Sequence, residues 1–338
     1  MSYTTLTLTT RKILPVVFLA TAALAACQDE PPTAPAPADA LAAKTGAGKP
    51  SAVETVVFSA YVGESRQDIY AMNPDGSNVR RITTDTAPDL EPDFAPGNRK
   101  IVWTRGDGLA ARLYTANPDG TKQTPLTPLG VPASGARFSP DGTRIAFVGV
   151  VTDSTNPTSP ATYSEIFVIN ADGTGLKRLT YDRDDTEDSR PTWSPDGTKL
   201  AFASTRGGAA DASIYEMTAD GLDLHLLRSC AAACDYPAYS PDGTRIAFAN
   251  YADGTITVRT IASGAETAVG PGFEGLPEHS DQPAWTKDGA QVLFTSNRGT
   301  EGTYELYVGK PNDPGSISTV RRLTVFSPGQ AFGPAYSH

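Results

Sequence analysis

The sequence predicts an all-β fold, a six-bladed β-propeller of four-stranded blades, and three observations support this prediction. A ten-residue phrase recurs as F-S-P-D-G-T-R-I-A-F at 138–147, W-S-P-D-G-T-K-L-A-F at 193–202 and Y-S-P-D-G-T-R-I-A-F at 239–248. The copies are separated by the length of chain that four short strands need. The chain also ends on the first residues of a further copy, which does not continue.

Looser copies of the phrase extend the repeat in both directions, at 94–103 (F-A-P-G-N-R-K-I-V-W) and 285–294 (W-T-K-D-G-A-Q-V-L-F). The third residue of each copy serves as a marker, and these markers are Pro96, Pro140, Pro195, Pro241 and Lys287. The intervals between them are 44, 55, 46 and 46 residues. A period in the mid-forties that carries four strands is typical of one propeller blade.

Each unit contains four strand-like segments separated by turns. In the unit that begins at Arg190 these segments are P-T-W-S, K-L-A-F-A-S, S-I-Y-E-M-T and L-D-L-H-L-L. Ser-Pro-Asp-Gly forms the first turn, because proline fixes φ, aspartate bonds its own backbone and glycine accepts positive φ. Asn-Pro-Asp-Gly at 73–76 and 117–120 and Asn-Ala-Asp-Gly at 170–173 mark a second hairpin. The I-A-F runs are apolar on both faces, as expected of a strand packed between neighbouring blades.

The two ends of the chain fix the number of blades. Before the first marker lie V-V-F-S-A-Y, D-I-Y-A-M-N and V-R-R-I-T, which match the second, third and fourth strands of a unit. The last residues, G-P-A-Y-S-H at 333–338, match the missing first strand. We therefore expect the C-terminal strand to pair with the N-terminal three strands (3+1), which closes the ring at six blades and removes exposed sheet edges.

The N-terminus predicts export and lipidation. Arg11 and Lys12 precede an apolar run from Ile13 to Ala26, which is too short to span a membrane and predicts a signal peptide over residues 1–26. The ending Leu-Ala-Ala-Cys resembles the lipobox of bacterial lipoproteins, which implies a lipid anchor on Cys27. An ordinary signal peptide with a chance cysteine is the alternative. Residues 27–53 are rich in Pro and Ala and predict an extended tether ahead of the propeller at 54–338.

The charge balance narrows the range of partners. The whole chain has a formal net charge of −10, and because Arg11 and Lys12 are its only charges before Cys27, the remainder carries 26 basic and 38 acidic residues. This acidic balance argues against binding to nucleic acid or to anionic lipid. Gln28 follows Cys27, which favours the bacterial outer membrane as the place of anchoring, with the propeller facing the periplasm or the cell surface.

The repeat resembles that of the TolB-like WD-type propeller family, from roughly Glu54 to His338. The resemblance implies the propeller fold, and such propellers serve as scaffolds, binding modules or accessory domains of enzymes. TolB itself carries an α/β domain ahead of its propeller, where this chain has the Pro/Ala-rich segment. We therefore expect a family member other than TolB itself.

Catalytic and metal-binding patterns are weak in the sequence. His225, His279 and His338 fall in three different blades without metal-ligand spacing, and no nucleophile elbow G-x-S-x-G is present. We expect no enzyme activity, no cofactor and no metal. The acidic loop 182–190 lacks the glycine-containing spacing of a calcium loop, so a solvated loop and a calcium site both stay open. Cys230 and Cys234, in S-C-A-A-A-C-D-Y, are expected to form a local disulfide outside the cytoplasm.

One face of the propeller is the candidate binding face. The links between blades and those between second and third strands share this face, and both carry charged residues. The candidates are Asp89, Glu91, Arg105, Asp188, Arg190, Arg206, Asp235, Asp281 and Arg298. The arginines either pair with neighbouring carboxylates to fix loop shape or form a charged rim around the channel that receives a partner.

The sequence therefore predicts a lipid-anchored, non-enzymatic cell-envelope protein whose propeller is a protein-binding or scaffold module. The expected partner is another envelope protein or a peptide. The alternative is a carbohydrate-binding, hydrolytic or lyase propeller that acts at the channel mouth.

Overall fold

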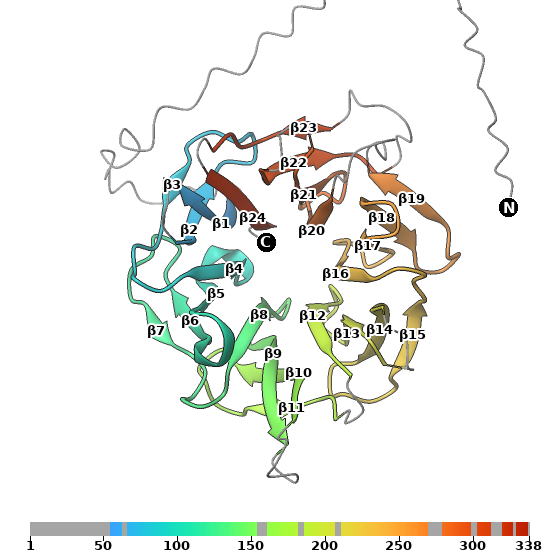
Figure 1. Ribbon diagram of the computed structural model, residues 1–338, viewed down its shortest axis with the longest axis horizontal. Helices are drawn as coiled ribbons and strands as arrows, with labels where there is room; N and C mark the ends of the chain where they lie inside the picture. Colours follow the sequence, from blue (N-terminus) through green and yellow to red (C-terminus); the bar gives the residue numbers. More distant parts are fainter. Residues whose placement is uncertain are drawn as a thin grey trace, which may run out of the picture. The chain divides into compact units, whose positions relative to one another are not determined.

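The computed structural model describes residues 55–62, 66–153, 161–181, 186–206, 211–269, 279–298, 303–311, 320–326 and 329–336. These residues form six antiparallel sheets of four strands each, arranged in a ring with one strand of every sheet nearest the centre (Figure 1). The prediction of an all-β, six-bladed propeller is confirmed. Helical structure in this part of the chain consists of two short 3-10 turns, η1 (Pro96–Asn98) and η2 (Gly108–Ala110).

The first three blades are described here, with the strands of each given from the centre of the ring outward. The closing blade contains β24 (Gly329–Tyr336), β1 (Val56–Val62), β2 (Asp68–Met72) and β3 (Arg80–Arg81). The second contains β4 (Asp89–Phe94), β5 (Ile101–Arg105), β6 (Arg112–Ala116) and β7 (Thr124–Pro125). The third contains β8 (Ala133–Phe138), β9 (Arg144–Asp153), β10 (Ala161–Asn170) and β11 (Lys177–Arg178).

The remaining blades follow the same order. The fourth contains β12 (Asp188–Trp193), β13 (Lys199–Ser204), β14 (Ser213–Thr218) and β15 (His225–Arg228). The fifth contains β16 (Cys234–Tyr239), β17 (Arg245–Asn250), β18 (Thr255–Thr260) and β19 (Glu266–Val269). The sixth contains β20 (Ser280–Trp285), β21 (Val292–Ser296), β22 (Glu305–Gly309) and β23 (Arg321–Arg322).

The ring closes by pairing the last strand of the chain with the first. β24 runs antiparallel to β1, with Val56 opposite Tyr336 and Val62 opposite Gly329. The predicted 3+1 closure is therefore confirmed, and Figure 1 shows β24 on the inner side of β1. Because both partners are buried along most of their length, closure joins the ends of the chain through a full interior strand pair rather than an edge contact.

The core lies between the blades. The second strand of each blade carries one aromatic side chain that is fully buried, namely Phe58, Trp103, Phe147, Phe202, Phe248 and Phe294. In five blades this ring faces an aromatic ring of the third strand, as in Phe294 and Tyr307, whose centroids lie 6.0 Å apart. The repeated phrase thus supplies one large side chain per blade interface, which is why its I-A-F segment is apolar on both faces.

The Ser-Pro-Asp-Gly turns connect first and second strands and also join neighbouring blades. In the turn at 139–142, Oδ1 of Asp141 accepts hydrogen bonds from Ser139 Oγ (2.5 Å), Thr143 N (2.9 Å) and Thr143 Oγ1 (2.8 Å). These hydrogen bonds lower the pKa of Asp141. Gly142 has a φ of +71°, and a Cβ there would lie 3.2 Å from Pro96 in the turn of the preceding blade. We call the face that carries these turns the turn face and the opposite one the link face.

In four blades the second turn packs still more closely on its neighbour. Gly120, in Asn-Pro-Asp-Gly, has a φ of +82°, and a Cβ there would overlap the carbonyl oxygen of Ile82 in the adjacent blade. Equivalent approaches join Gly76 to Leu323, Gly173 to Leu126 and Gly221 to Leu179. These glycines are therefore required both for their backbone conformation and for the close contact between blades.

Gly120→Ala should destabilise the propeller more than Gly130→Ala. Both glycines have a φ of +82°, but a Cβ at Gly130 meets nothing within 4 Å. Gly130→Ala should therefore lower the free energy of unfolding by about 1–2 kcal/mol, because alanine is unfavourable in the left-handed conformation. Gly120→Ala should lower it by about 1–3 kcal/mol more, because its Cβ also overlaps the neighbouring blade. Thermal or urea unfolding of the two variants measures the difference. Equal losses of stability would contradict the interblade role of Gly120.

The third blade departs from the repeat. β9 and β10 are ten residues long, and their pairing continues to Asp153 and Ala161. No other blade of the described part has second and third strands longer than seven residues. This extension accounts for the interval of 55 residues in the sequence. The extended β9–β10 hairpin projects from the link face.

Candidate functional site in the central channel

Six equivalent residues, one from each innermost strand, surround the channel axis. All six have a positive φ, between +53° and +63°, and they are Glu91, Gly135, Arg190, Tyr236, Gln282 and Gly333. Each lies where the pairing with the second strand shifts by a β-bulge. A left-handed conformation is costly for residues other than glycine, so four of the six blades accept strain to place a side chain here. We call this set the channel ring.

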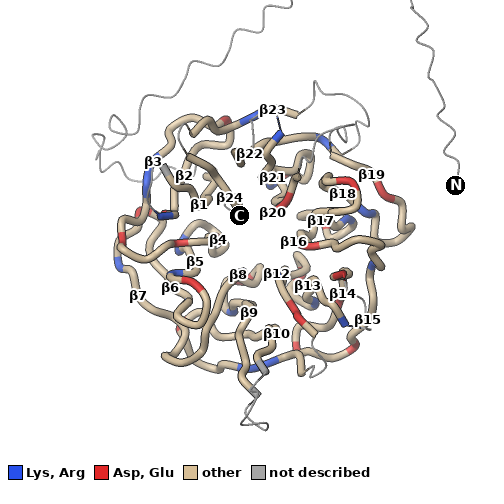
Figure 2. Tube along the Cα trace, viewed as in Figure 1, with Lys and Arg blue, Asp and Glu red and all other residues tan. Residues whose placement is uncertain are grey.

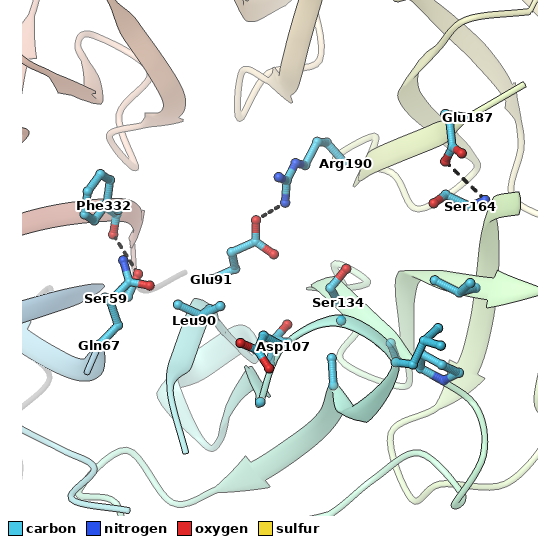
Figure 3. A pocket seen from close by; sticks show the side chains of 18 of the residues that line it. Ser59, Gln67, Leu90, Glu91, Asp107, Ser134, Ser164, Glu187, Arg190 and Phe332 are labelled. Atoms are coloured by element: carbon cyan, nitrogen blue, oxygen red, sulfur yellow. Dashed lines mark hydrogen bonds and ion pairs between the residues drawn. The ribbon is translucent and has the colours of Figure 1, made fainter. Parts of the chain in front are cut away.

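Side chains of the channel ring contact one another across the channel. Arg190 Nη1 forms an ion pair with Glu91 Oε1, which joins the fourth blade to the second (Figure 3). Gly135 of the intervening blade lies beside this contact, and a Cβ there would be 3.7 Å from Glu91 Oε2, an ordinary van der Waals distance. The guanidinium of Arg190 lies 4.4 Å from the ring centroid of Tyr236. Gln282 Oε1 accepts a hydrogen bond from the backbone of Gly333 (2.7 Å).

A cavity of about 590 Å³ opens from the channel ring to the link face. Glu91, Arg190, Tyr236 and Gln282 form part of its lining, and further walls come from η2 and from the extended β9–β10 hairpin. Phe332 of β24 also lines it (Figure 3). Leu109 of η2 is 70% exposed at this cavity. The lining therefore combines the charged pair Glu91–Arg190 with the exposed side chain of Leu109 and with the acidic residues Asp107 and Glu187. We call this cavity the link-face cavity.

A smaller cavity of about 280 Å³ lies on the turn-face side of the same ring. The prolines of the repeats and several aromatic side chains line it, among them Trp193 and Trp285. Their indole N–H groups donate to the backbone oxygens of Arg137 (3.1 Å) and Ala238 (3.0 Å). The walls of this cavity are thus built from the repeat itself, whereas those of the link-face cavity come from segments that differ between blades.

Asp235 and Asp281 precede the ring residues Tyr236 and Gln282 on neighbouring innermost strands. Burial raises the pKa of both carboxyls, that of Asp281 to about 7, and the charge of Arg190 only partly offsets this effect. Asp235 Oδ1 accepts a hydrogen bond from the backbone of Tyr236 (2.8 Å). Asp281 Oδ1 is buried and has no hydrogen-bond partner among the residues that the structure describes. Burial also raises the pKa of Tyr236 to about 12.

The structure separates the nine candidate residues into two groups. Glu91, Arg190, Asp235 and Asp281 come together at the channel, and Figure 2 shows acidic residues on the innermost strands β4, β16 and β20. The other five form hydrogen bonds that join the end of the second strand to the start of the first strand of the same blade. These residues are Asp89, Arg105, Asp188, Arg206 and Arg298.

The contacts of this second group fit the interpretation in which arginines fix loop shape. Arg105 Nε donates to Asp89 Oδ1 (2.7 Å), which also accepts from the indole of Trp103 (2.8 Å). Arg206 Nη2 lies 2.6 Å from Asp188 Oδ2. In the sixth blade the acid is replaced by serine, and Arg298 Nη2 donates to Ser280 Oγ (3.1 Å).

The remaining predicted residues lie away from the channel ring or outside the described residues. Cys230 and Cys234 form a disulfide with an S–S distance of 2.09 Å, which joins the link before β16 to the first residue of that strand. His225 lies 3.5 Å from Glu216 at the outer edge of its blade, and His279 packs against Tyr251. Cys27, the leader, the tether, His338 and residues 182–185 of the acidic loop lie outside the described residues. Within the described ranges, no three His, Cys, Asp or Glu side chains form a metal-ligand cluster.

Sequence reasoning missed most of the channel ring and the mouth of the link-face cavity. Tyr236, Gln282, Leu109 and Tyr163 were not among the candidates. A signal for the ring was present, because five of its six residues directly precede the proline of the first strand, as in Tyr236–Pro237. The residue before this proline differs from blade to blade, whereas the proline itself is repeated in five blades. Such variation is typical of a functional position on a repeated scaffold.

Comparison with known proteins agrees with this architecture. The fold and its channel define a β-propeller whose turn-face segments repeat from blade to blade and whose link-face segments differ between blades. The TolB beta propeller domain, as a family, matches residues 157–269. The Tol-Pal system protein TolB of Anaeromyxobacter dehalogenans (strain 2CP-C) is 27% identical over 147 residues, which are 43% of this chain and 31% of that protein. The propeller of this chain is therefore similar in sequence to that of TolB over part of its length.

Solved structures show the same fold. TolB from Acinetobacter baumannii superposes with a TM-score of 0.66 at 19% identity, over 84% of this chain and 66% of that one. A chain of the nidogen/laminin complex gives 0.63 at 12% identity, over 84% of this chain and 98% of that one. The chain spans about a third of the length of the TolB relatives that it matches in sequence. Partial coverage agrees with the expectation that it is not TolB itself. In the described part of the chain no helix has the length and apolarity to cross a bilayer.

Asp281→Asn should make the stability of the propeller less dependent on pH. The pKa of Asp281 rises from an unfolded value of 3.8 to about 7 on folding, so the folded state binds the extra proton. Stability is therefore lost as pH rises from about 4 to 7, by no more than about 4 kcal/mol. Asp235 and Arg190 face the same carboxyl and stay in the variant.

The stability difference between Asp281→Asn and the unaltered protein should grow in favour of the variant over this pH range and stay constant above it. Urea unfolding at several pH values measures this difference. A difference that does not vary with pH would show that Asp281 titrates as an ordinary surface carboxyl.

Proposed function

We propose that the chain is a lipid-anchored, non-enzymatic envelope protein whose propeller binds another envelope protein or a peptide at the link-face cavity. The observation that carries this proposal is the cavity of about 590 Å³, whose lining combines the exposed apolar side chain of Leu109 with the charged pair Glu91–Arg190. Stable protein recognition commonly uses buried apolar anchors surrounded by polar groups that fix orientation. A pocket of this size accommodates several side chains of a partner.

The shape of the cavity also supports recognition of a macromolecule. Its walls come from the segments in which this chain departs from the repeat, namely η2 and the extended hairpin of the third blade. Val150 and Tyr163 of that hairpin line the cavity. Binding residues are concentrated on connecting segments that a rigid scaffold positions. The relatives matched in sequence are named as members of the Tol-Pal system, an assembly of proteins, and protein binding is the property we extend to this chain.

The anchor and the location are part of the same proposal. The leader at 1–26, Cys27 after Leu-Ala-Ala and the Pro/Ala-rich tether up to residue 53 support lipidation and tethering at the outer membrane. The propeller would then face the periplasm or the cell surface. The acidic balance of the chain disfavours nucleic acid as a partner.

Leu109→Asp should reduce capture of a protein partner, because it places a charge at the apolar mouth of the cavity. The matched control is Leu222→Asp, since Leu222 is 65% exposed near the outer edge of the fourth blade. Cross-linking in intact cells, followed by purification from membranes and mass spectrometry, measures capture. A loss of at least about tenfold is expected for the cavity variant and none for the control. Retention of glycans without any protein partner would overturn the proposal in favour of a carbohydrate-binding propeller.

Cys27→Ser should release the protein from the membrane fraction, because it removes the thiol that would carry the lipid. Fractionation of cells and immunoblotting compare the variant with the unaltered protein, and Cys230→Ser serves as a control that alters a different cysteine. If the Cys27→Ser protein stays with the membrane at the level of the control, the lipid anchor is wrong.

A further inference from the structure

The two most exposed large apolar side chains in the described part of the chain belong to Leu129 and Leu109, which are 82% and 70% exposed. Leu109 lies in η2, and Leu129 lies in the link between β7 and β8, so both are on the link face. Residues 107–112 and 127–132 make up these two segments, and we call their exposed part the second-blade surface. Apolar side chains that gather on one exposed surface indicate contact with another molecule.

The two segments of the second-blade surface lie side by side. Arg112 Nη2 donates a hydrogen bond to the backbone oxygen of Thr127, where the link begins. Ala133 N donates to the backbone oxygen of Ala111 (3.0 Å), where the link ends. The link is therefore held at both ends by the segment that carries η2. Leu129 and Arg112 are not part of the lining of the link-face cavity, so the second-blade surface extends outward from that cavity.

Arg112 reverses the charge found at its position in other blades. Three other blades carry a buried acid at this position of the third strand, paired with an arginine of the outermost strand, and these pairs are Asp68–Arg81, Glu165–Arg178 and Glu305–Arg322. The sequence around the position is similar in all four blades and reads D-I-Y, R-L-Y, E-I-F and E-L-Y. In the second blade Arg112 stands in place of the acid and Pro125 in place of the arginine.

The charge of Arg112 is not balanced by a carboxylate in the described part of the chain. Asp85 and Asp89 both pair with Arg105, which lies opposite Arg112 across β5 and β6. Arg112 Nη2 supplies the hydrogen bond to the Thr127 carbonyl that the outer arginine supplies in the other three blades. Its Nε is buried and has no hydrogen-bond partner among the described residues. A half-buried guanidinium without a counter-charge favours a ligand that brings one.

We propose that the protein partner also covers the second-blade surface, where its apolar side chains pack on Leu109 and Leu129 and one of its aspartate or glutamate carboxylates pairs with Arg112. The inference rests on the proposed function and adds the place and the chemistry of a second contact, outside the channel. A guanidinium suits this contact, because its planar shape binds a carboxylate through two parallel hydrogen bonds. The surrounding apolar contacts would exclude water and so strengthen the ion pair.

Two other occupants fit the second-blade surface less well. Anionic lipid is disfavoured, because the chain has a net charge of −10 and lipid of this kind is usually bound by clusters of several basic residues. A free anion such as phosphate would pair with Arg112 but would leave Leu109 and Leu129 exposed. A protein segment with both apolar and acidic side chains accounts for both features of the surface.

The first experiment locates the partner on the full-length protein in intact cells. The photo-cross-linking residue benzoylphenylalanine replaces Leu129, and in a control protein it replaces Leu222, which is 65% exposed near the outer edge of the fourth blade. Mass spectrometry of the adduct identifies the cross-linked segment. The protein linked to position 129 should be the one that Leu109→Asp fails to capture, and its segment should contain apolar residues and an aspartate or glutamate. The control position should not give this adduct.

The second experiment measures capture of that protein by variants. Leu129→Asp and Arg112→Glu should each reduce capture at least about tenfold. Arg322→Gln is the matched control, since Arg322 donates the equivalent hydrogen bond to the carbonyl of Thr324 (2.8 Å) in the sixth blade. This control should leave capture unchanged although it lowers the thermal unfolding midpoint, and so it separates binding from loss of stability.

Reversal of the charges tests the ion pair directly. When the acid identified in the cross-linked segment is replaced by arginine, the altered partner should be captured again by Arg112→Glu but not by Leu129→Asp. A purely structural role of Arg112 would not give this rescue. Should Arg112→Glu not fold, the altered partner still decides the question, because the unaltered protein should then capture it at least about tenfold less.

Several outcomes would overturn the inference. Cross-links from position 129 only to lipid, or only to a second copy of the chain, would assign the surface to the membrane or to self-association. Full capture by both Leu129→Asp and Arg112→Glu, with loss in Leu109→Asp, would leave the proposed function intact and show that the partner does not reach this surface. Failure of the reversed charges to restore capture would show that Arg112 pairs with no carboxylate of the partner. If Leu109→Asp captures the partner fully, the proposed function itself fails.

Discussion

The antiparallel pairing of β24 with β1 is the contact on which the rest of the structure depends. It joins residues at opposite ends of the propeller and leaves every blade packed between two others. Only in a closed ring do six innermost strands face one axis, which brings Arg190 against Glu91 although 99 residues separate them in sequence. Closure therefore creates the channel as well as the stability of the ring, because a row of blades without closure would have no shared centre.

The channel ring depends on a second constraint, the left-handed residue in each innermost strand. Side chains of a regular strand alternate between its two faces, whereas a β-bulge re-aims a side chain and bends the strand locally. Here every bulge places the residue before the repeat's proline, or its counterpart Gly135, at the channel. Two glycines at this position keep space open, and Glu91, Arg190, Tyr236 and Gln282 fill the remainder. The scaffold is therefore repeated, while the chemistry at its centre is specified by one variable residue per blade.

The fold could be predicted from the sequence almost completely, because the determinants of a repeat are local and recur with a constant period. The fourth blade illustrates this, since K-L-A-F-A-S and S-I-Y-E-M-T match β13 and β14 residue for residue. The outermost strand was predicted less well. It begins at His225 rather than at Leu222, because Leu222 belongs to the hydrogen-bonded turn that starts at Thr218, and the pairing with β14 starts at His225.

The candidate site was harder to predict, because one step along a strand changes the surroundings of a side chain completely. Asp89 and Asp188 open their strands and are buried against arginines of the same blade. Asp235 and Asp281 stand one position later in the repeat, after Cys234 and Ser280, and lie at the channel. In the sequence all four read as acids ahead of a first strand. The shift by one position therefore moves the carboxylate of the fifth and sixth blades from an ion pair with an arginine of its own blade to the channel, where Arg190 is the cation that acts on it.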